Sequence, residues 1–297
     1  MAVSRAAVEV AARRRLRFRP RPQHLPPTML VGGSVLVLFF LVAVTAPLWE
    51  PYDPTQAGAA LPYLPASWHH VFGTDVLGRD VFSRVAEGTR EVLFLSLAST
   101  ALAVVLGGLV GLVSGYVGGW LDELLMRVFE TIISIPLLVL ALLAMAAAGP
   151  ELSGSSALLI GVVVLVYAPR IARMARAVAV DLVTRDFVTV ARSRGESVRS
   201  IVWRELTPNA AGVLLVEFGV RAGYAPILIS SLGFLGFGAQ PPSPEWGLMI
   251  SENRAAIVTA PLSVLGPAGA LAVLVISLNL VTDGIARALG RSAERTP

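Results

Sequence analysis

The sequence contains no cysteine and no lysine, and all 24 basic residues among its 297 positions are arginine. The missing cysteine excludes disulfides, thiolate catalysis and cysteine-based metal sites. The missing lysine excludes a conventional P-loop ATPase, because the Walker A motif uses a lysine to reach the β- and γ-phosphates. If ATP drives this protein, the nucleotide and its magnesium ion therefore belong to another subunit, and we expect no cofactor on this chain.

Charge and histidine are also scarce. Charged residues make up 15 % of the chain and hydrophobic residues 55 %, with a mean hydropathy of +0.72, whereas a soluble domain carries roughly 25 % charge. Of the three histidines, His69 and His70 are adjacent, so their side chains point apart, and no ligand follows them at helical spacing. The composition therefore predicts a membrane protein, and the histidines do not predict a metal site.

Six apolar segments are each close to the length of about 20 residues that a helix needs to cross a hydrocarbon core of about 30 Å. We therefore expect an all-α polytopic membrane protein, whose even number of spans places both termini on one side. The predicted spans are residues 29–49, 92–115, 128–148, 152–168, 210–235 and 261–281.

Residues 1–28 are rich in arginine and proline and predict a basic arm on an anionic membrane surface. The run from Arg13 to Arg17 has a weak likeness to a twin-arginine export signal. Because residues 29–49 form a stretch longer than the apolar part of a signal peptide, we interpret that stretch as an uncleaved first span.

Arginine distribution predicts the orientation of the spans. With the N-terminus inside the cell, 19 arginines fall in cytoplasmic segments and four outside, and Arg221 lies within a span. This bias predicts a protein of the bacterial plasma membrane with both termini on the cytoplasmic side. The predicted cytoplasmic segments are 1–28, a loop at 170–209 and a tail at 286–297; the predicted outer segments are 50–91 and 236–260, and the five-span core covers 92–285.

The stretch 186–209 is the longest charged, helix-compatible run in the chain. Helical sequence from Phe187 to Arg194 ends at Gly195, which can adopt positive φ, and resumes from Glu196 until just before Pro208. On residue chemistry alone this is a solvated basic loop containing two short helices. The order Ala191, Gly195, Pro208 resembles the cytoplasmic "EAA" loop of importer-type ABC permeases, although Thr189 and Val190 replace the first two residues of that motif.

Two outer segments are similar to the same group of proteins. Residues 72–84 read FGTDVLGRDVFSR, which predicts turns at Gly73 and Gly78 followed by an amphipathic interfacial helix. This segment resembles the FGTDxLGRDxFSR pattern of C-type permeases of the dipeptide, oligopeptide and nickel transport family. Residues 232–247, LGFLGFGAQPPSPEWG, predict a span that breaks into a turn, and they resemble the SFLGLGxQPPxPxWG stretch of the same subunit.

The resemblance implies the type I ABC importer permease fold and one of the two membrane subunits of a dipeptide or oligopeptide importer working by alternating access. The implied partners are a second permease, two ATPase subunits, an extracellular solute-binding protein, membrane lipid and the peptide, without nucleic acid. Cargoes such as a nickel chelate or glutathione stay open as alternatives.

The resemblance also assigns coupling to the ATPase to five positions of the 186–209 loop. Phe187 would fill a groove on the ATPase, Ala191 would let the backbones approach and Arg192 would pair with a carboxylate. The five positions are Phe187, Ala191, Arg192, Gly195 and Pro208.

Glu217 and Arg221 are the most conspicuous charges within a predicted span. Their i, i+4 spacing puts them on one helix face, where they can neutralise each other. Either they form a structural ion pair against a partner subunit or they line the translocation pathway, and the sequence leaves both open.

Two other classes of function were weighed. An intramembrane protease needs a span histidine or facing span aspartates, and the predicted spans offer neither. An ion-coupled secondary transporter usually has more spans and inverted repeats; no duplicated halves are visible, but this class stays open as an alternative.

Overall fold

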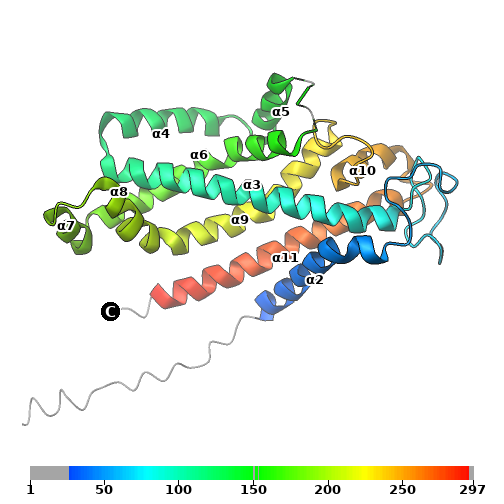
Figure 1. Cartoon of the computed structure of the whole chain (residues 1–297), viewed down its shortest axis with the longest axis horizontal. Helices are drawn as coiled ribbons and strands as arrows, with labels where there is room; N and C mark the ends of the chain where they lie inside the picture. The colour runs from blue at the N-terminus through cyan, green and yellow to red at the C-terminus, as the bar shows by residue number, and fades with distance from the viewer. Residues whose placement is uncertain (1–26, 150, 153, 294–297) are drawn as a thin grey trace, which may run out of the picture.

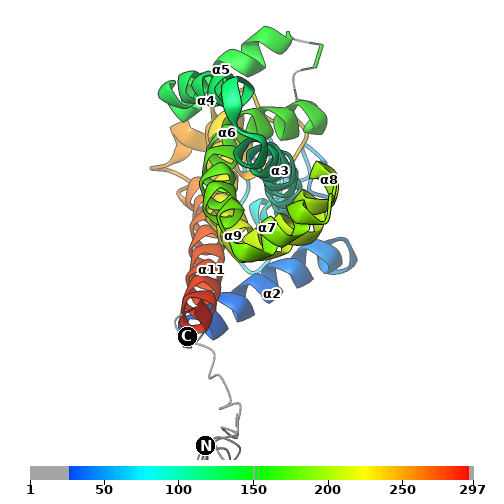
Figure 2. The ribbon, with the colours of Figure 1, turned by 90° about the vertical axis from the view of Figure 1, so that its left-hand side faces the viewer.

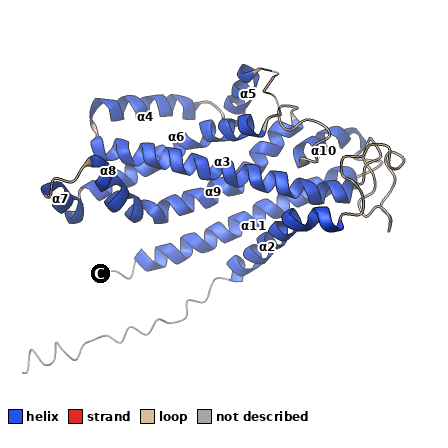
Figure 3. Cartoon of the chain, in the orientation of Figure 1, coloured by secondary structure: helices blue, strands red, loops and turns tan. Residues whose placement is uncertain are grey.

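A computed structural model describes residues 27–149, 151–152 and 154–293. Apart from Pro27 and Thr28, the basic arm predicted for residues 1–28 lies outside the described residues. Within them the regular structure is helical (Figure 3), and β-type pairing is limited to one isolated bridge between Thr74 and Asp80. The all-α prediction is thus confirmed.

The helices follow one another with short connections, except at the outer segment between α2 and α3 (Figure 1). The long helices are α2 (Pro27–Trp49), α3 (Val81–Val117), α4 (Gly119–Ser134), α5 (Leu137–Ala148), α6 (Ser156–Val183), α9 (Thr207–Phe234) and α11 (Leu262–Ala293). The short ones are α7 (Asp186–Ser193), α8 (Val198–Ile201), the π-helical turn η1 (Val202–Leu206), α10 (Trp246–Asn253) and the 3-10 turn η2 (Arg254–Ala256).

Five helical segments are long and apolar enough to span a membrane, and the bent pair α4–α5 makes a sixth span if counted as one. Within the described residues, five of the six predicted spans are therefore confirmed by length and composition, and the one at 128–148 is confirmed only if α4 and α5 count as one span. The start of α2 lies beside the end of α11, where the Arg287 guanidinium donates to the Thr28 hydroxyl at 2.8 Å. In Figures 1 and 2 this end of the molecule also carries α7 and α8, while α10 and the outer segment lie at the opposite end.

The second span begins earlier than predicted. The Asp80 carboxylate accepts a bond from the Ser83 backbone at 2.8 Å and so caps a helix that runs unbroken for 37 residues from Val81 to Val117. The expectation of a separate interfacial helix within 50–91 is therefore wrong, because the residues expected to form it are the first turns of α3. The outer connection is limited to residues 50–80.

The third span is broken rather than straight. α4 ends at Ser134, and α5 begins at Leu137 with its axis turned by 98°. Pro136 explains the break, because its ring disfavours helical backbone at Ile135 and its nitrogen has no proton to donate. Figure 1 shows α4 alongside α6 and α5 turned away from the bundle.

The cytoplasmic loop predicted at 170–209 is mostly helix. α6 continues to Val183, so Arg170, Arg173 and Arg176 lie on a spanning helix instead of in a loop. At the other side of the connection, helical backbone resumes at Val198 and runs without a break through Pro208 into α9. The non-helical connection is thus limited to a few residues on each side of α7.

The most extensive contact between two helices of the described bundle is that of α3 with α6. Gly107, Gly111 and Gly115 form a stripe on α3, and each lies against a backbone carbonyl of α6, from Ala168, Ala172 and Arg176 respectively. A Cβ added at Gly107 or Gly115 would lie 2.5 or 2.7 Å from that carbonyl oxygen. Small residues at i, i+4 spacing allow helices in a membrane to approach in this way.

Candidate functional site

The predicted helix in the 186–209 stretch is α7, and its end has the geometry expected at Gly195. Gly195 has φ +73°. Its N–H donates to the Arg192 carbonyl at 2.9 Å, and the Glu196 N–H donates to the Ala191 carbonyl at 3.3 Å. These are the two bonds of a Schellman cap, which satisfies carbonyls at the end of the helix. The prediction that Gly195 ends the first helix is confirmed.

One face of α7 is turned into the protein. Val188 and Ala191 are fully buried with Ile201 and Leu206, and Phe187 packs half-buried against the same group. The structure thus differs from the expectation that Ala191 opens towards a partner. The small Ala191 side chain lets α7 approach its own chain, because the 188, 191 spacing lies on one helix face.

The opposite face of α7 carries an apolar side chain that the sequence analysis did not single out. Val190 is 51 % exposed, next to the exposed Asp186 and Thr189. The signal was present in the sequence, since a residue two positions after Val188 points to the other side of the helix. Val190, rather than Ala191, is the apolar side chain that α7 leaves exposed.

Arg192 connects α7 to the end of α3. Its guanidinium carbon lies 4.7 Å from the centroid of the Tyr116 ring, and its Nε donates to the Tyr116 hydroxyl at 3.3 Å. Stacking of this kind is worth roughly 0.5–1 kcal/mol at an exposed site. Arg192, which was predicted to pair with a carboxylate of a partner, thus contacts Tyr116 of its own chain and remains exposed.

The turn after Gly195 is closed by polar bonds. The Glu196 carboxylate accepts from Arg194 at 2.6 Å and from the Ser200 hydroxyl at 2.9 Å. The Arg194 bond, followed by the Ser200 bond, holds the pKa of Glu196 below its ordinary value of 4.5. The carboxylate therefore stays charged at neutral pH and bridges the two sides of the turn.

Pro208 lies in the first turn of α9, directly after the π-helical turn η1. Proline cannot donate to the carbonyl four residues back and its ring clashes with it. The wider turn accommodates this residue: the Thr207 N–H and, at 2.8 Å, its hydroxyl both donate to the Val202 carbonyl. Pro208 therefore widens the helix locally instead of ending it.

Glu217 and Arg221 form the predicted ion pair on α9. The Arg221 Nε donates to the Glu217 carboxylate at 3.2 Å, a terminal guanidinium nitrogen lies 3.0 Å from the same oxygen, and both side chains are half-buried. The Arg221 guanidinium carbon also lies 5.8 Å from the centroid of the buried Tyr167 ring on α6. Arg170 of α6 is close enough to interact with Arg221 electrostatically. The pairing is confirmed, and its role stays a prediction.

A buried charge cluster, which the sequence analysis did not assign, lies at the end of the bundle that carries α10. The Asp75 carboxylate accepts from Arg79 and Arg84, each at 2.6 Å, and Glu252 of α10 accepts from the same two arginines at 2.7 and 3.0 Å. Asp75, Arg79 and Arg84 are almost completely buried. Two negative and two positive charges compensate one another, as buried ions require.

The proline-rich segment before α10 attaches to the first turns of α3. The Arg84 guanidinium donates to the Ser243 carbonyl at 3.0 Å, the Ser243 hydroxyl to Glu91 at 2.6 Å, and the Trp246 indole to the Val85 carbonyl at 3.1 Å. The two outer segments that resemble known permeases, 72–84 and 232–247, therefore meet in space. No spacing in the sequence predicts this contact, since the partners are about 160 residues apart.

A second unassigned charge pair fixes α4 to α6 near the inner end. Arg176 donates to Asp122 from Nε at 2.6 Å and from a terminal nitrogen at 2.5 Å, and the Ser114 hydroxyl of α3 donates to the same carboxylate. Asp122 is buried. This pair holds the first arm of the broken span against the bundle.

His70, one of the adjacent histidines that do not predict a metal site, contacts an acidic and an aromatic side chain. His70 Nδ1 lies 2.9 Å from an Asp80 carboxylate oxygen, and its ring packs on Tyr52 with the centroids 4.7 Å apart. Across the described residues, no three histidine, aspartate or glutamate side chains are grouped so as to hold a metal ion.

Comparison with known proteins gives one family match and three concordant relatives. The family described as "Binding-protein-dependent transport system inner membrane component" matches residues 107–295. The chain is 33 % identical to the dipeptide transport system permease protein DppC of Alkalihalophilus pseudofirmus, over 88 % of this chain and 84 % of the relative. It is 33 % identical to the protein of the same name from Haemophilus influenzae (88 % and 89 %) and 34 % identical to the glutathione transport system permease protein GsiD of Pectobacterium atrosepticum (88 % and 85 %).

Proposed function

Because the chain belongs to the family of binding-protein-dependent transport system inner membrane components, we propose that it forms one half of the passage of an ATP-driven peptide importer. The observation that carries this proposal is the similarity to dipeptide permeases, which extends over at least 84 % of each of those relatives. The family membership decides against an ion-coupled secondary transporter. Glutathione is itself a small peptide, so it is the alternative cargo within the same chemistry; none of the relatives named above points to a nickel chelate.

The proposed partners follow from the family and from the surfaces that the bundle leaves open. A second permease would complete the passage, two ATPase subunits would supply ATP and its magnesium ion, and a solute-binding protein would deliver the peptide. The absence of lysine supports the placement of the nucleotide on another subunit. The exposed leucines of α4 and α5 supply an apolar surface for lipid or for the second permease.

The proposed coupling route runs through α7. Its exposed face, centred on Val190, would contact the ATPase, while its buried face is fixed by Val188 and Ala191. Arg192 joins it to α3 through Tyr116, and the Schellman cap at Gly195 fixes its exit. A displacement of α7 would thus be passed to α3 by packed side chains rather than lost in a flexible loop. In this scheme Phe187, Ala191, Arg192, Gly195 and Pro208 shape and anchor the coupling element.

The half-buried pair Glu217 and Arg221 supports a proposal for the passage itself. With Arg170 nearby, this part of the bundle has more positive than negative charge, and a peptide carries a carboxylate at one end. We assign Arg221 a transient contact with that carboxylate. The alternative, an ion pair facing the second permease, predicts that removing both charges disturbs assembly instead of uptake of charged peptides.

The coupling proposal is tested by Val190→Asp in the assembled transporter. A carboxylate on this exposed face does not disturb the fold, but burying it against the ATPase costs several kcal/mol. We expect uptake of a labelled dipeptide, and stimulation of ATP hydrolysis by the loaded binding protein, to fall by about tenfold or more.

Val180→Asp is the matched control, because Val180 is a valine of similar exposure, 47 %, near the inner end of α6. Normal coupling in Val190→Asp, or equal loss in both variants, contradicts the assignment. Competition of the labelled dipeptide by glutathione separates the two cargo alternatives in the same assay.

A further inference from the structure

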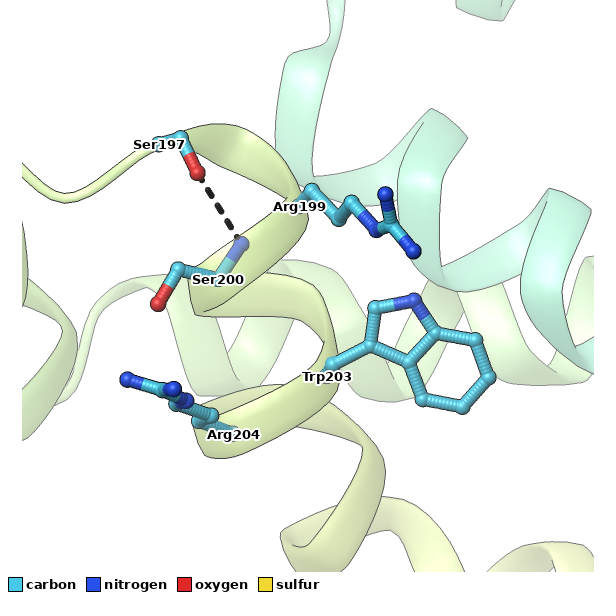
Figure 4. A pocket seen from close by; sticks show the side chains of 5 residues that line it. All are labelled: Ser197, Arg199, Ser200, Trp203 and Arg204. Atoms are coloured by element: carbon cyan, nitrogen blue, oxygen red, sulfur yellow. Dashed lines mark hydrogen bonds between the residues drawn. The ribbon is translucent and has the colours of Figure 1, made fainter.

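A hollow of about 510 Å³ opens at the inner end of the bundle, beside the coupling element. Its lining comes from one short stretch of chain, α8 and the π-helical turn that follows it (Figure 4). The lining residues are Ser197, Arg199, Ser200, Trp203 and Arg204. Figure 4 shows Arg199 and Trp203 projecting on one side of this helix, and Arg204 on the other side next to Ser200.

The charge of the hollow is not compensated by its neighbours. Arg199 and Arg204 are exposed, and within the described part of the chain neither has an acidic partner at ion-pair distance. Glu196 is close enough to Arg204 to interact electrostatically, but its carboxylate is already bonded to Arg194. Each of the two guanidinium groups therefore has free donors on its own side of the helix, and such donors suit the oxygens of a phosphate.

The exposure of Trp203 indicates that the phosphate within reach belongs to a lipid head group. Its indole is 52 % exposed although the neighbouring Val202 and Leu206 are buried. Exposed tryptophan next to arginine is typical of the level at which a membrane protein meets lipid head groups, because the ring is apolar and its N–H needs a polar partner.

The length of the helix places Trp203 at that level. The helical segment from Val198 to Phe234 has 37 residues, which corresponds to about 55 Å at 1.5 Å per residue. Centred on a hydrocarbon layer of about 30 Å, it projects about 12 Å at each end. Trp203 lies about 8 Å from its start and hence about 4 Å beyond the hydrocarbon boundary, among the head groups.

We infer that this stretch binds the phosphates of anionic membrane lipids, with Arg199 contacting one head group beside Trp203 and Arg204 contacting another on the opposite side of the helix. Basic pockets at the ends of spanning helices bind acidic head groups in this way. The site uses a different surface from the exposed face of α7, and it does not depend on which cargo the protein carries. Bound lipid would anchor the element that links α7 to α9.

The test measures retained lipid in the purified transporter by native mass spectrometry, after reconstitution with mixtures of phosphatidylglycerol and phosphatidylcholine. An arginine near a membrane surface contributes about fivefold in affinity for an acidic lipid. We therefore expect Arg199→Gln/Arg204→Gln to lower phosphatidylglycerol retention by about fivefold at each of the two positions and to leave phosphatidylcholine retention unchanged. Arg185→Gln/Arg254→Gln removes the same charge from exposed positions outside the hollow and should change neither.

Brominated phosphatidylglycerol gives a second readout, since it should quench wild-type tryptophan fluorescence more than that of Trp203→Phe. Equal retention in the two double variants, or equal quenching with and without Trp203, overturns the proposal. Displacement of the lipid by millimolar inorganic phosphate would show a free-anion site instead. Loss of ATPase subunits from Arg199→Gln/Arg204→Gln in lipid-free detergent would show that the hollow is a protein contact.

Discussion

At the scale of single residues, the buried charge cluster at the α10 end of the bundle needs every charge to keep a partner. Arg79 and Arg84 are both buried, and each has Asp75 and Glu252 as partners. A buried ion pair adds little over an apolar replacement, but a buried ion that loses its partner is strongly destabilising. The cluster therefore fixes the position of the outer segment relative to α10 more than it adds to overall stability.

Asp75→Asn tests this directly. The change leaves the two buried arginines with a single carboxylate, so we expect the free energy of unfolding to fall by about 3–5 kcal/mol. Chemical unfolding of the detergent-purified protein, followed by near-ultraviolet circular dichroism, measures it. Asp53→Asn is the control, because this exposed carboxylate accepts its bonds within its own turn, from the backbone N–H and the hydroxyl of Thr55. A loss below about 1 kcal/mol at Asp75 would contradict the described role.

Sequence reasoning succeeds at residues whose partners are nearby in the chain. The Glu217–Arg221 pair follows from helical spacing alone, and the left-handed Gly195 follows from the end of a helical pattern. The Asp75–Glu252 cluster could not be found in this way, because its members are brought together by the fold over about 170 residues. Ala191 shows a third case: its place on α7 was predicted correctly, but only the packing shows that it faces inward.

At the scale of elements, α3 and α6 are held together by shape. The glycine stripe on α3 leaves no room for a side chain against the α6 carbonyls. In a lipid environment such close packing replaces the hydrophobic effect as the force that joins helices. The position of this contact predicts which substitutions in the bundle are tolerated.

Gly111→Ala should destabilise the α3–α6 contact, because the new Cβ would overlap the Ala172 carbonyl and the Ala175 side chain. Overpacking of this kind costs about 1–3 kcal/mol. Gly269→Ala on α11 makes the same chemical change where no atom lies within 4 Å of the new Cβ, and it should be neutral. Thermal unfolding midpoints of the two variants in one detergent measure the difference; equal midpoints would argue against a tight α3–α6 contact.

The boundaries of the elements were predicted less well than their existence. Apolar length alone identifies the spans, but it cannot show that polar residues 81–91 continue the helix of the second span or that α6 extends to Val183. Both extensions pass beyond the apolar layer and depend on packing with other segments. The break at Pro136 was visible in the sequence, since a proline within a predicted span restricts the residue before it.

At the scale of the whole molecule, the orientation predicted from arginine counts can be tested without background labelling, because the chain has no cysteine. Trp68, fully exposed in the outer segment, and Ser193, exposed at the end of α7, lie at opposite ends. A membrane-impermeant maleimide added to intact spheroplasts should label Trp68→Cys and not Ser193→Cys. After the membrane is opened both should react, and the reverse pattern in intact spheroplasts would invert the topology.

The unbroken course of α3 has a consequence for how the two surfaces of the membrane communicate. One end of this helix carries Arg84 within the outer charge cluster, and the other end carries Tyr116 beneath Arg192. Because α3 has no break between those points, a displacement at one end would be carried to the other. If the chain assembles as proposed, the solute-binding protein and the ATPase would therefore act on the same helix. A displacement of either end of α3 would then also displace the other end.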